Sequence, residues 1–159
     1  MILKNKVVVI PAYNEEKTLE NIIFKIKNFA DVIVVNDGST DKTLSIAKKN
    51  NVRIINHHSN LGYDKSISDG LHLAQKLDYK FIVTIDADNQ HDVQDIKVFF
   101  NLLEFKEYKL ILGTRKITNR MSENLLNFFI KIFFGIDDLL CGLKGYDVSI
   151  IRKYNNTHS

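Results

Sequence analysis

The chain has 159 residues, of which 45% are hydrophobic, and its 22 Lys and Arg against 19 Asp and Glu give a formal net charge of +3. A chain of this length and composition can bury the core of one globular domain, so we expect a single domain over residues 1–159. The charges are spread along the sequence without a block of one sign, which argues against nucleic-acid binding. Cys141 is the only cysteine, so an intrachain disulfide is excluded and a reducing compartment is expected.

Residues 1–6 lead directly into a strand-like run without a long apolar signal region, which predicts a cytoplasmic protein. The most apolar stretch, residues 124–140, contains Lys131, Asp137 and Asp138. It falls short of the roughly 20 apolar residues that a membrane span needs. Two interpretations stay open for this stretch: a core helix that covers the sheet, or a helix that lies peripherally on the cytoplasmic face of a membrane.

Strand-like runs alternate with helical patterns along the chain. The predicted strands are residues 6–10, 32–36, 52–56, 80–85 and 109–112, and the predicted helices are residues 15–29, 39–49, 66–77 and 92–104. Consecutive apolar residues suit strands that are covered on both faces. The alternation predicts an α/β fold with a mainly parallel sheet flanked by helices. In such sheets ligands bind beyond the carboxyl ends of the strands.

Polar clusters follow the first two predicted strands. Pro11-Ala12-Tyr13-Asn14-Glu15-Glu16 follows the first, and its proline favours an extended exit from the strand. Asn36-Asp37-Gly38-Ser39-Thr40-Asp41 follows the second, where Gly38 permits a sharp turn and Asp37 can accept hydrogen bonds from a nucleobase or a ribose. For each cluster alone, turn formation and helix capping are the alternative, with Ser39 or Thr40 as the expected cap.

A third cluster, Asp86-Ala87-Asp88, ends the predicted strand 80–85. In an extended segment, residues i and i+2 face the same way at roughly 6.5–7 Å, so both carboxylates can converge on one ligand. Hard oxygen ligands suit Mg²⁺ or Mn²⁺ with water and phosphate completing the coordination. The pair therefore predicts a metal that bridges a diphosphate, and a solvated turn is the alternative.

Taken together, the clusters resemble glycosyltransferase family 2, the inverting nucleotide-sugar transferases with the GT-A fold. The resemblance also rests on Asn60-Leu61-Gly62 with Gly70, on the run Asp86-Ala87-Asp88-Asn89-Gln90-His91 and on Gly113-Thr114-Arg115. The Asp-Ala-Asp-x-Gln-His form is most similar to the dolichyl and polyprenyl phosphate sugar synthase branch. The resemblance implies a GT-A type nucleotide-diphospho-sugar transferase fold, with a nucleotide-binding part over residues 1–92 and an acceptor part over residues 93–154.

The same resemblance assigns roles to individual residues. It gives Asp88 and Gln90 to a Mg²⁺ or Mn²⁺ ion and Asp86 to the nucleotide. It places further residues around the base and ribose of a UDP- or GDP-linked sugar: Pro11, Ala12, Tyr13, Asn14, Glu15 and Asp37. His57, His58 and His72 lack the spacing of metal ligands, so we interpret them as surface or supporting residues.

On the acceptor side, Arg115, Arg120 and Ser122 are candidates for holding a phosphate, because guanidinium groups bind phosphate with paired hydrogen bonds. The segment Asp138-Leu139-Leu140-Cys141-Gly142-Leu143-Lys144 resembles the family motif Asp-x-x-Cys-Gly-Phe-Lys, with Leu143 in place of the aromatic residue. By that resemblance Asp138 is the catalytic carboxylate. It is a general base if the acceptor is a hydroxyl, and it positions groups if the acceptor is an ionised phosphate.

The expected function is therefore metal-dependent transfer of a hexosyl group from a nucleotide diphosphate sugar to polyprenyl phosphate, in cell-envelope biogenesis. One alternative is transfer to a saccharide hydroxyl in surface polysaccharide synthesis. Another is a truncated, non-catalytic sugar-nucleotide-binding module. Peripheral membrane contact or a membrane subunit is an expected partnership. The aspartyl phosphohydrolases also use D-x-D, but there the motif is expected on the first strand, where this chain has Pro11-Ala12-Tyr13-Asn14.

The chain departs from the family pattern in two places. After Gly62 the usual run of small residues becomes Tyr63-Asp64-Lys65-Ser66, which is expected to reshape the wall near the diphosphate. The chain also ends soon after Lys144, whereas related catalytic domains usually continue. We therefore expect the fold to be shortened at its C-terminus.

Overall fold

The computed structural model describes residues 5–89, 91–105, 108–114 and 141–157. Within these residues a six-stranded sheet has the order β3-β2-β1-β4-β6-β5. Its strands are β1 (Lys6–Ala12), β2 (Asp31–Asn36), β3 (Arg53–Asn56), β4 (Phe81–Thr84), β5 (Leu110–Leu112) and β6 (Lys144–Asp147). The helices are α1 (Leu19–Ile26), α2 (Thr43–Lys49), α3 (Tyr63–Lys76), α4 (Val93–Glu104) and α6 (Val148–Thr157).

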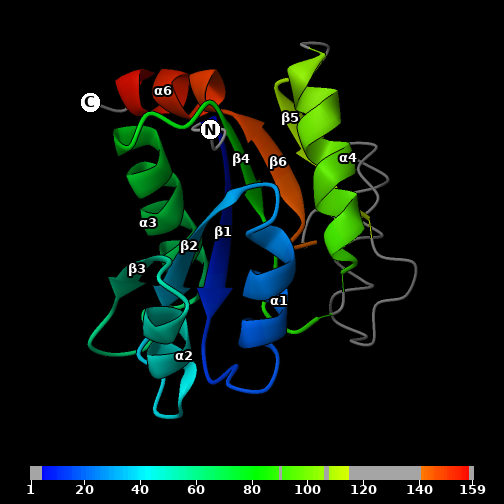
Figure 1. Ribbon diagram of the computed structural model, residues 1–159. Helices are drawn as coiled ribbons and strands as arrows, with labels where there is room; N and C mark the ends of the chain where they lie inside the picture. Colours follow the sequence, from blue (N-terminus) through cyan, green and yellow to red (C-terminus); the bar gives the residue numbers. More distant parts are fainter. Residues whose placement is uncertain (1–4, 90, 106–107, 115–140, 158–159) are drawn as a thin grey trace.

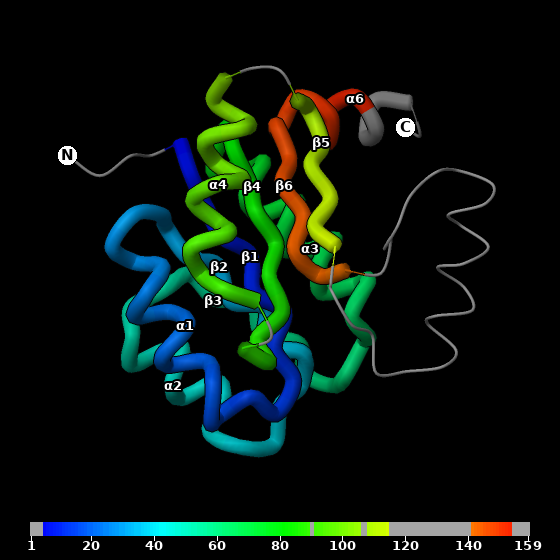
Figure 2. The backbone as a smooth tube through the Cα atoms, turned by 90° about the vertical axis from the view of Figure 1, so that its right-hand side faces the viewer, coloured from blue at the N-terminus to red at the C-terminus, as the bar shows by residue number. Residues whose placement is uncertain are grey.

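Helices cover both faces of the sheet, as Figures 1 and 2 show. Because successive side chains of a strand point to opposite faces, Val8 and Ile10 of β1 pack with α1, α2 and α4, whereas Val7 and Val9 pack with α3 and α6. All four side chains are fully buried. The consecutive apolar residues of β1 therefore supply two cores at once, which confirms the predicted α/β fold with helices on both faces.

The N-terminal part of the sheet is parallel, as predicted. β1 pairs in parallel with β2 and with β4, and β2 pairs in parallel with β3. Register pairs between β1 and β4 end at Val9 and Thr84. Pro11 lies beyond that point, so its missing N–H falls where β4 no longer continues beside β1.

Two described elements, β6 and α6, are absent from the sequence-based prediction. β6 inserts between β4 and β5 and runs antiparallel to both. Its sequence, Lys144-Gly145-Tyr146-Asp147, lacks an apolar run. Gly145 is nevertheless buried, and a Cβ there would lie 3.0 Å from the Phe99 ring of α4. Close packing of β6 under α4 therefore favours a glycine. A glycine does not add to an apolar run, so hydropathy does not predict a strand here.

The expected caps of α2 are wrong. The helix begins at Thr43, and the Asp41 carboxylate accepts the Thr43 backbone N–H at 2.9 Å. Ser39 and Thr40 instead contact the loop that follows β1. The predicted helix 15–29 is also shorter in the structure: α1 spans Leu19–Ile26, and residues 16–18 form a turn before it.

β1, β2 and β4 run in the same direction, toward the bottom of Figure 1, so their carboxyl ends face one edge of the sheet. We call the segments 13–16, 37–41, 57–62 and 85–89 at this edge the carboxyl edge. None of the helices in the described ranges has both the length and the apolar character to cross a membrane. The sequence left two interpretations open for residues 124–140, a core helix or a helix on a membrane surface. These residues lie outside the described part of the chain.

Candidate functional site

The loops that follow β1 and β2 are joined by hydrogen bonds. The Asn14 backbone N–H donates to the Ser39 hydroxyl at 3.0 Å, and the Asn14 side-chain oxygen accepts the Thr40 backbone N–H at 2.9 Å. The Glu15 backbone N–H donates to the Thr43 hydroxyl at 2.8 Å. Asn14 has a φ of 57°, a left-handed conformation that Asn tolerates better than most residues. Asn14 and Glu15 therefore help to build the carboxyl edge, beside the exposed Tyr13.

Asp37 follows β2 and is buried, with 4% of its surface exposed. One carboxylate oxygen accepts the Leu61 backbone N–H at 2.9 Å and faces a ring nitrogen of His57 at 2.7 Å, and the other accepts the Gly62 backbone N–H at 2.9 Å. Burial by itself raises the pKa of Asp37, but these hydrogen bonds outweigh it and hold the pKa below its ordinary value. Asp37 is therefore an ionised anchor for the loop that follows β3.

Gly38 brings that loop against the end of β2. Its φ is 70°, and a Cβ at this position would lie 2.4 Å from the Ser59 carbonyl carbon. Glycine is required here both by the left-handed backbone and by the close approach of the two chain segments. The turn after β2 and residues 57–62 consequently form one packed unit around Asp37.

Asp86 follows β4 and is half-buried. The Tyr63 hydroxyl donates to one of its carboxylate oxygens at 2.9 Å. Gly142 lies against the same carboxylate, because a Cβ added to Gly142 would be 2.1 Å from both oxygens. The Asp86 carboxylate is thus held between the first residue of α3 and the chain that leads into β6.

Asp88 is exposed, two residues beyond Asp86, and Asn89 turns the chain with a φ of 62°. The carboxylates of Asp86 and Asp88 are hard oxygen donors of the kind that Mg²⁺ and Mn²⁺ prefer. In the ranges that the structure describes, no group of three or more His, Cys, Asp or Glu residues is arranged to hold a metal ion. The donor set fits an open site in which a bound diphosphate and water supply most of the ligands.

The chain around residues 141–142 is also brought to the end of β4. The Thr84 hydroxyl donates to the Gly142 carbonyl oxygen at 2.8 Å, and the buried Cys141 sulfur lies 3.7 Å from a ring nitrogen of His91. The end of the Asp-x-x-Cys-Gly segment is therefore adjacent to the Asp-Ala-Asp segment. The predicted site residues that fall outside the described ranges are Gln90, Arg115, Arg120, Ser122 and Asp138.

Three residues in or beside the carboxyl edge carry contacts that the sequence-based roles do not include: His57, Tyr63 and Gly142. The sequence could have pointed to Tyr63, because Tyr63 interrupts the run of small residues that is usual in the family. Gly142 lies within a recognised motif, but the reason for a glycine there appears only from its contact with Asp86. His57 has no spacing signal, since its partners Asp37 and Asp69 are 20 and 12 residues away.

Residues 7–148 match the family described as Glycosyl transferase family 2. The chain is 30% identical to the UDP-N-acetylglucosamine--dolichyl-phosphate N-acetylglucosaminyltransferase of Methanococcus voltae, over 91% of this chain and 70% of that protein. It is 29% identical to the dodecaprenyl-phosphate galacturonate synthase of Rhizobium johnstonii, over 91% of this chain and 48% of that protein. The branch suggested by the Asp-Ala-Asp-x-Gln-His form is thus present among its relatives.

The fold matches that of glucosyl-3-phosphoglycerate synthase from Mycobacterium tuberculosis in complex with UDP, with a TM-score of 0.74 and 22% identity over 92% of this chain and 57% of the other. The same enzyme has been solved with Mn²⁺ and UDP. The chain spans about half to two thirds of the length of several curated relatives that it matches. The sheet has the GT-A architecture, and the chain belongs to glycosyl transferase family 2.

Proposed function

We propose that this chain binds a nucleotide diphosphate sugar at the carboxyl edge and takes part in inverting transfer of the sugar to a polyprenyl phosphate. The observation that carries the proposal is the convergence at one edge of Asp37 after β2 and Asp86 and Asp88 after β4. In this proposal Asp37 supplies acceptors for a nucleoside, and the carboxylates after β4 supply hard oxygen ligands for the cation of a diphosphate. Family membership and the geometry of the edge point to the same class of ligand.

The buried Asp37 carboxylate and the half-buried Asp86 carboxylate would each accept hydrogen bonds from a different part of the nucleoside. A carboxylate has about four acceptor positions, and the described contacts of Asp37 use three of them. The remaining position can accept a nucleobase N–H or a ribose hydroxyl. Asp86, held by Tyr63, would accept from the ribose side. In this proposal Pro11, Ala12 and Tyr13 line the space beside the base.

Asp88 and Gln90 would hold a Mg²⁺ or Mn²⁺ ion. The ion supplies positive charge for the leaving diphosphate, whose negative charge grows as the bond to the sugar breaks. Neighbouring structures of the fold with Mn²⁺ and UDP, and with Mg²⁺ and UDP, support this role. The described carboxylates would keep the diphosphate end of the donor at the tip of β4.

We infer a phosphate acceptor from two relatives whose names specify dolichyl phosphate and dodecaprenyl phosphate. A phosphate monoester is already an anion at neutral pH, so the site must hold it rather than remove a proton from it. In this proposal Arg115, Arg120 and Ser122 bind the acceptor phosphate, and Asp138 positions groups at the reacting carbon. Such an acceptor would bring the protein to the cytoplasmic face of a membrane.

Calorimetry with UDP, GDP and their sugar conjugates, in Mn²⁺ and in chelator, tests donor binding. Turnover is then measured with a short-chain polyprenyl phosphate and, in parallel, with saccharide acceptors. We expect metal-dependent binding of one nucleotide family and transfer to the lipid phosphate. Transfer to saccharides alone would mean that the acceptor is a saccharide hydroxyl and not a lipid phosphate. Binding without turnover would indicate a non-catalytic binding module. Absence of nucleotide binding would refute the proposal.

A further inference from the structure

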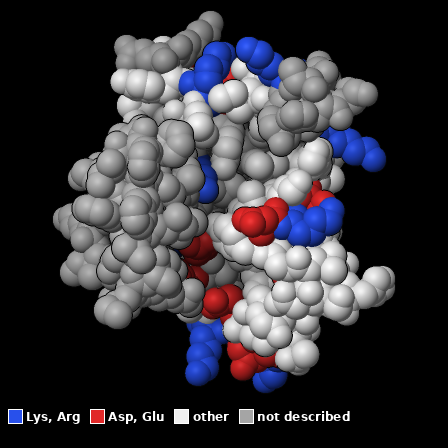
Figure 3. Space-filling model, turned by 180° about the vertical axis from the view of Figure 1, so that it is seen from behind, with Lys and Arg blue, Asp and Glu red and all other residues white. Residues whose placement is uncertain are grey.

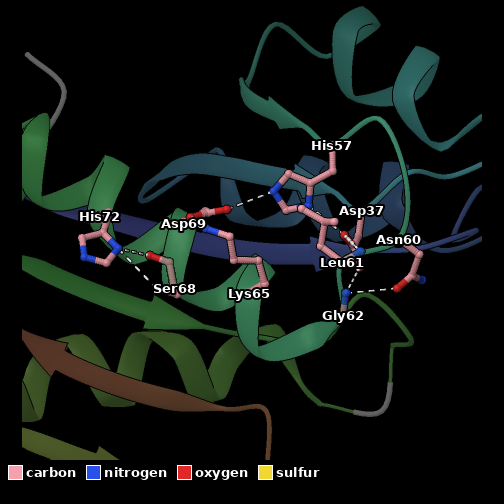
Figure 4. A network of polar contacts seen from close by, with 9 residues as sticks. All are labelled: Asp37, His57, Asn60, Leu61, Gly62, Lys65, Ser68, Asp69 and His72. Carbon is pink, nitrogen blue, oxygen red and sulfur yellow. Dashed lines mark hydrogen bonds and ion pairs between the residues drawn. The ribbon is translucent and has the colours of Figure 1, made fainter.

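His57 lies at the centre of a network of polar contacts at the carboxyl edge, which Figure 4 shows. One ring nitrogen lies 2.7 Å from an Asp37 oxygen, and the other lies 3.1 Å from an Asp69 oxygen of α3. Lys65 of α3 pairs with the second Asp69 oxygen at 2.7 Å. The side chains of His57 and Asp37 are only 7% and 6% exposed, so their charges are largely removed from water.

The positions of the two carboxylates determine the protonation of the ring. An ionised carboxylate only accepts hydrogen bonds, so each ring nitrogen that faces one must carry a hydrogen. The pKa of Asp69 lies below its ordinary value, first because Lys65 donates a hydrogen bond to it and also because His57 does. Asp37, His57, Asp69 and Lys65 thus form a row in which carboxylates alternate with nitrogen-bearing side chains.

The row joins elements that are distant in the sequence. The His57 backbone N–H donates to the Asn36 carbonyl oxygen at the end of β2 at 2.9 Å, while its side chain reaches α3 through Asp69. Asp37 in turn binds the backbone N–H groups of Leu61 and Gly62. A buried carboxylate that lost its charged partner would lose both neutralisation and one of its three donors.

We propose that His57 is a positioning residue of the donor site: as an imidazolium held between Asp37 and Asp69, it fixes the Asp37 carboxylate and the turn at residues 60–62 so that one acceptor position of Asp37 faces the nucleoside. The inference rests on the function proposed above. It assigns His57 no contact with the donor and no part in the chemical step. Its effect must therefore appear in nucleotide affinity, with the catalytic rate changed much less.

The first test compares UDP and GDP binding, in Mn²⁺, by the wild-type chain and by His57→Phe, which keeps a ring but removes both donors. We expect the affinity to fall by at least about tenfold, the scale of one charge-assisted hydrogen bond. His57→Gln keeps one donor and should recover part of the loss. His72→Phe is the matched control, because His72 is an exposed histidine of α3 that lies outside the carboxyl edge, and it should bind like the wild type.

A second measurement does not depend on a folded Phe variant. Nitrogen-15 spectra of the histidine rings in the wild-type chain should show both His57 nitrogens protonated at neutral pH. Asp69→Asn, which removes one carboxylate near the surface, should weaken nucleotide binding about threefold or more and shift these signals.

The outcomes separate the two proposals. A neutral His57 ring at neutral pH, or unchanged nucleotide affinity in a folded His57→Phe, overturns the role of His57 while the proposed function stands. A wild-type chain that binds neither UDP nor GDP overturns the proposed function and with it the donor role of His57.

Discussion

The Tyr63 hydroxyl donates a 2.9 Å hydrogen bond to the Asp86 carboxylate, although Tyr63 begins α3 and Asp86 follows β4. Burial and the negative charge of Asp86 raise the pKa of Tyr63 well above its ordinary value, so the phenol stays a donor. This contact joins α3 to the Asp-Ala-Asp segment across the carboxyl edge. Tyr63 consequently sets the orientation of a carboxylate that we assign to the nucleotide.

Tyr63→Phe should therefore weaken nucleotide binding without unfolding the chain. Tyr63 is about half exposed, so we expect a loss of about 1 kcal/mol, or roughly fivefold in affinity. Calorimetric titration with UDP and GDP measures it. Tyr108→Phe is the control, since Tyr108 is similarly exposed and lies outside the carboxyl edge; equal affinities for both variants would contradict an orienting role for Tyr63.

Asp88→Asn should remove most of the metal dependence of nucleotide binding. Losing a charged ligand should cost more than a charge-assisted hydrogen bond of about 1.5–3 kcal/mol, so affinity in Mn²⁺ should fall at least about tenfold. In chelator, the variant and the wild type should bind alike. Asp95→Asn serves as the control because Asp95 is an exposed carboxylate in the first turn of α4; a wild-type affinity that is unchanged by chelator would remove Asp88 from the metal site.

Gly142→Ala should displace the Asp86 carboxylate, since the added Cβ would lie 2.1 Å from its oxygens. We expect a loss of about 1–3 kcal/mol in the free energy of unfolding, as for other overpacked sites, together with weaker nucleotide binding. Urea unfolding and calorimetry measure the two effects. In Gly113→Ala the Cβ would lie 2.8 Å from the Leu143 carbonyl oxygen instead, so this control should lose stability but keep its nucleotide affinity.

Asp147 should contribute to stability in a way that is lost in acid. Burial raises its pKa, but hydrogen bonds from Ser149 and Lys109 outweigh burial and leave the pKa below the ordinary value of 3.8. Between the lowered and the ordinary pKa the unfolded chain binds more protons, so the free energy of unfolding falls as the pH falls through that window. Above about pH 5 Asp147 is ionised in both the folded and the unfolded chain, so its contribution to the free energy of unfolding should be constant.

The pH dependence is checked by urea unfolding between pH 7 and the acid limit, for the wild type and for Asp147→Asn. The difference in free energy of unfolding between them should be largest near neutral pH and should shrink only below about pH 4. Asp78→Asn, at an exposed position, is the comparison. A difference that grows in acid would mean that Asp147 has a raised pKa in the folded protein.

The sequence by itself predicted the strand and helix alternation, the parallel sheet and the polar clusters at strand ends. These features follow from local periodicity: consecutive apolar residues such as Val7, Val8 and Val9 identify a strand buried on both faces. Because parallel strands end at one edge, the clusters around Asp37 and Asp86 were expected to meet there. The roles of individual site residues rested on family resemblance and stay predictions.

Only the tertiary structure decided which donors surround those carboxylates. His57 and Asp37 are 20 residues apart, and Thr84 and Gly142 are 58 residues apart; no local pattern encodes such pairs, because they form only when separate elements pack. The same reason explains β6. Lys144-Gly145-Tyr146-Asp147 forms a strand because its backbone pairs with β4 on one side and β5 on the other, and because α4 packs over Gly145. Local physics thus determined the elements that the sequence predicted and their order, and packing determined β6 and the hydrogen bonds that shape the site.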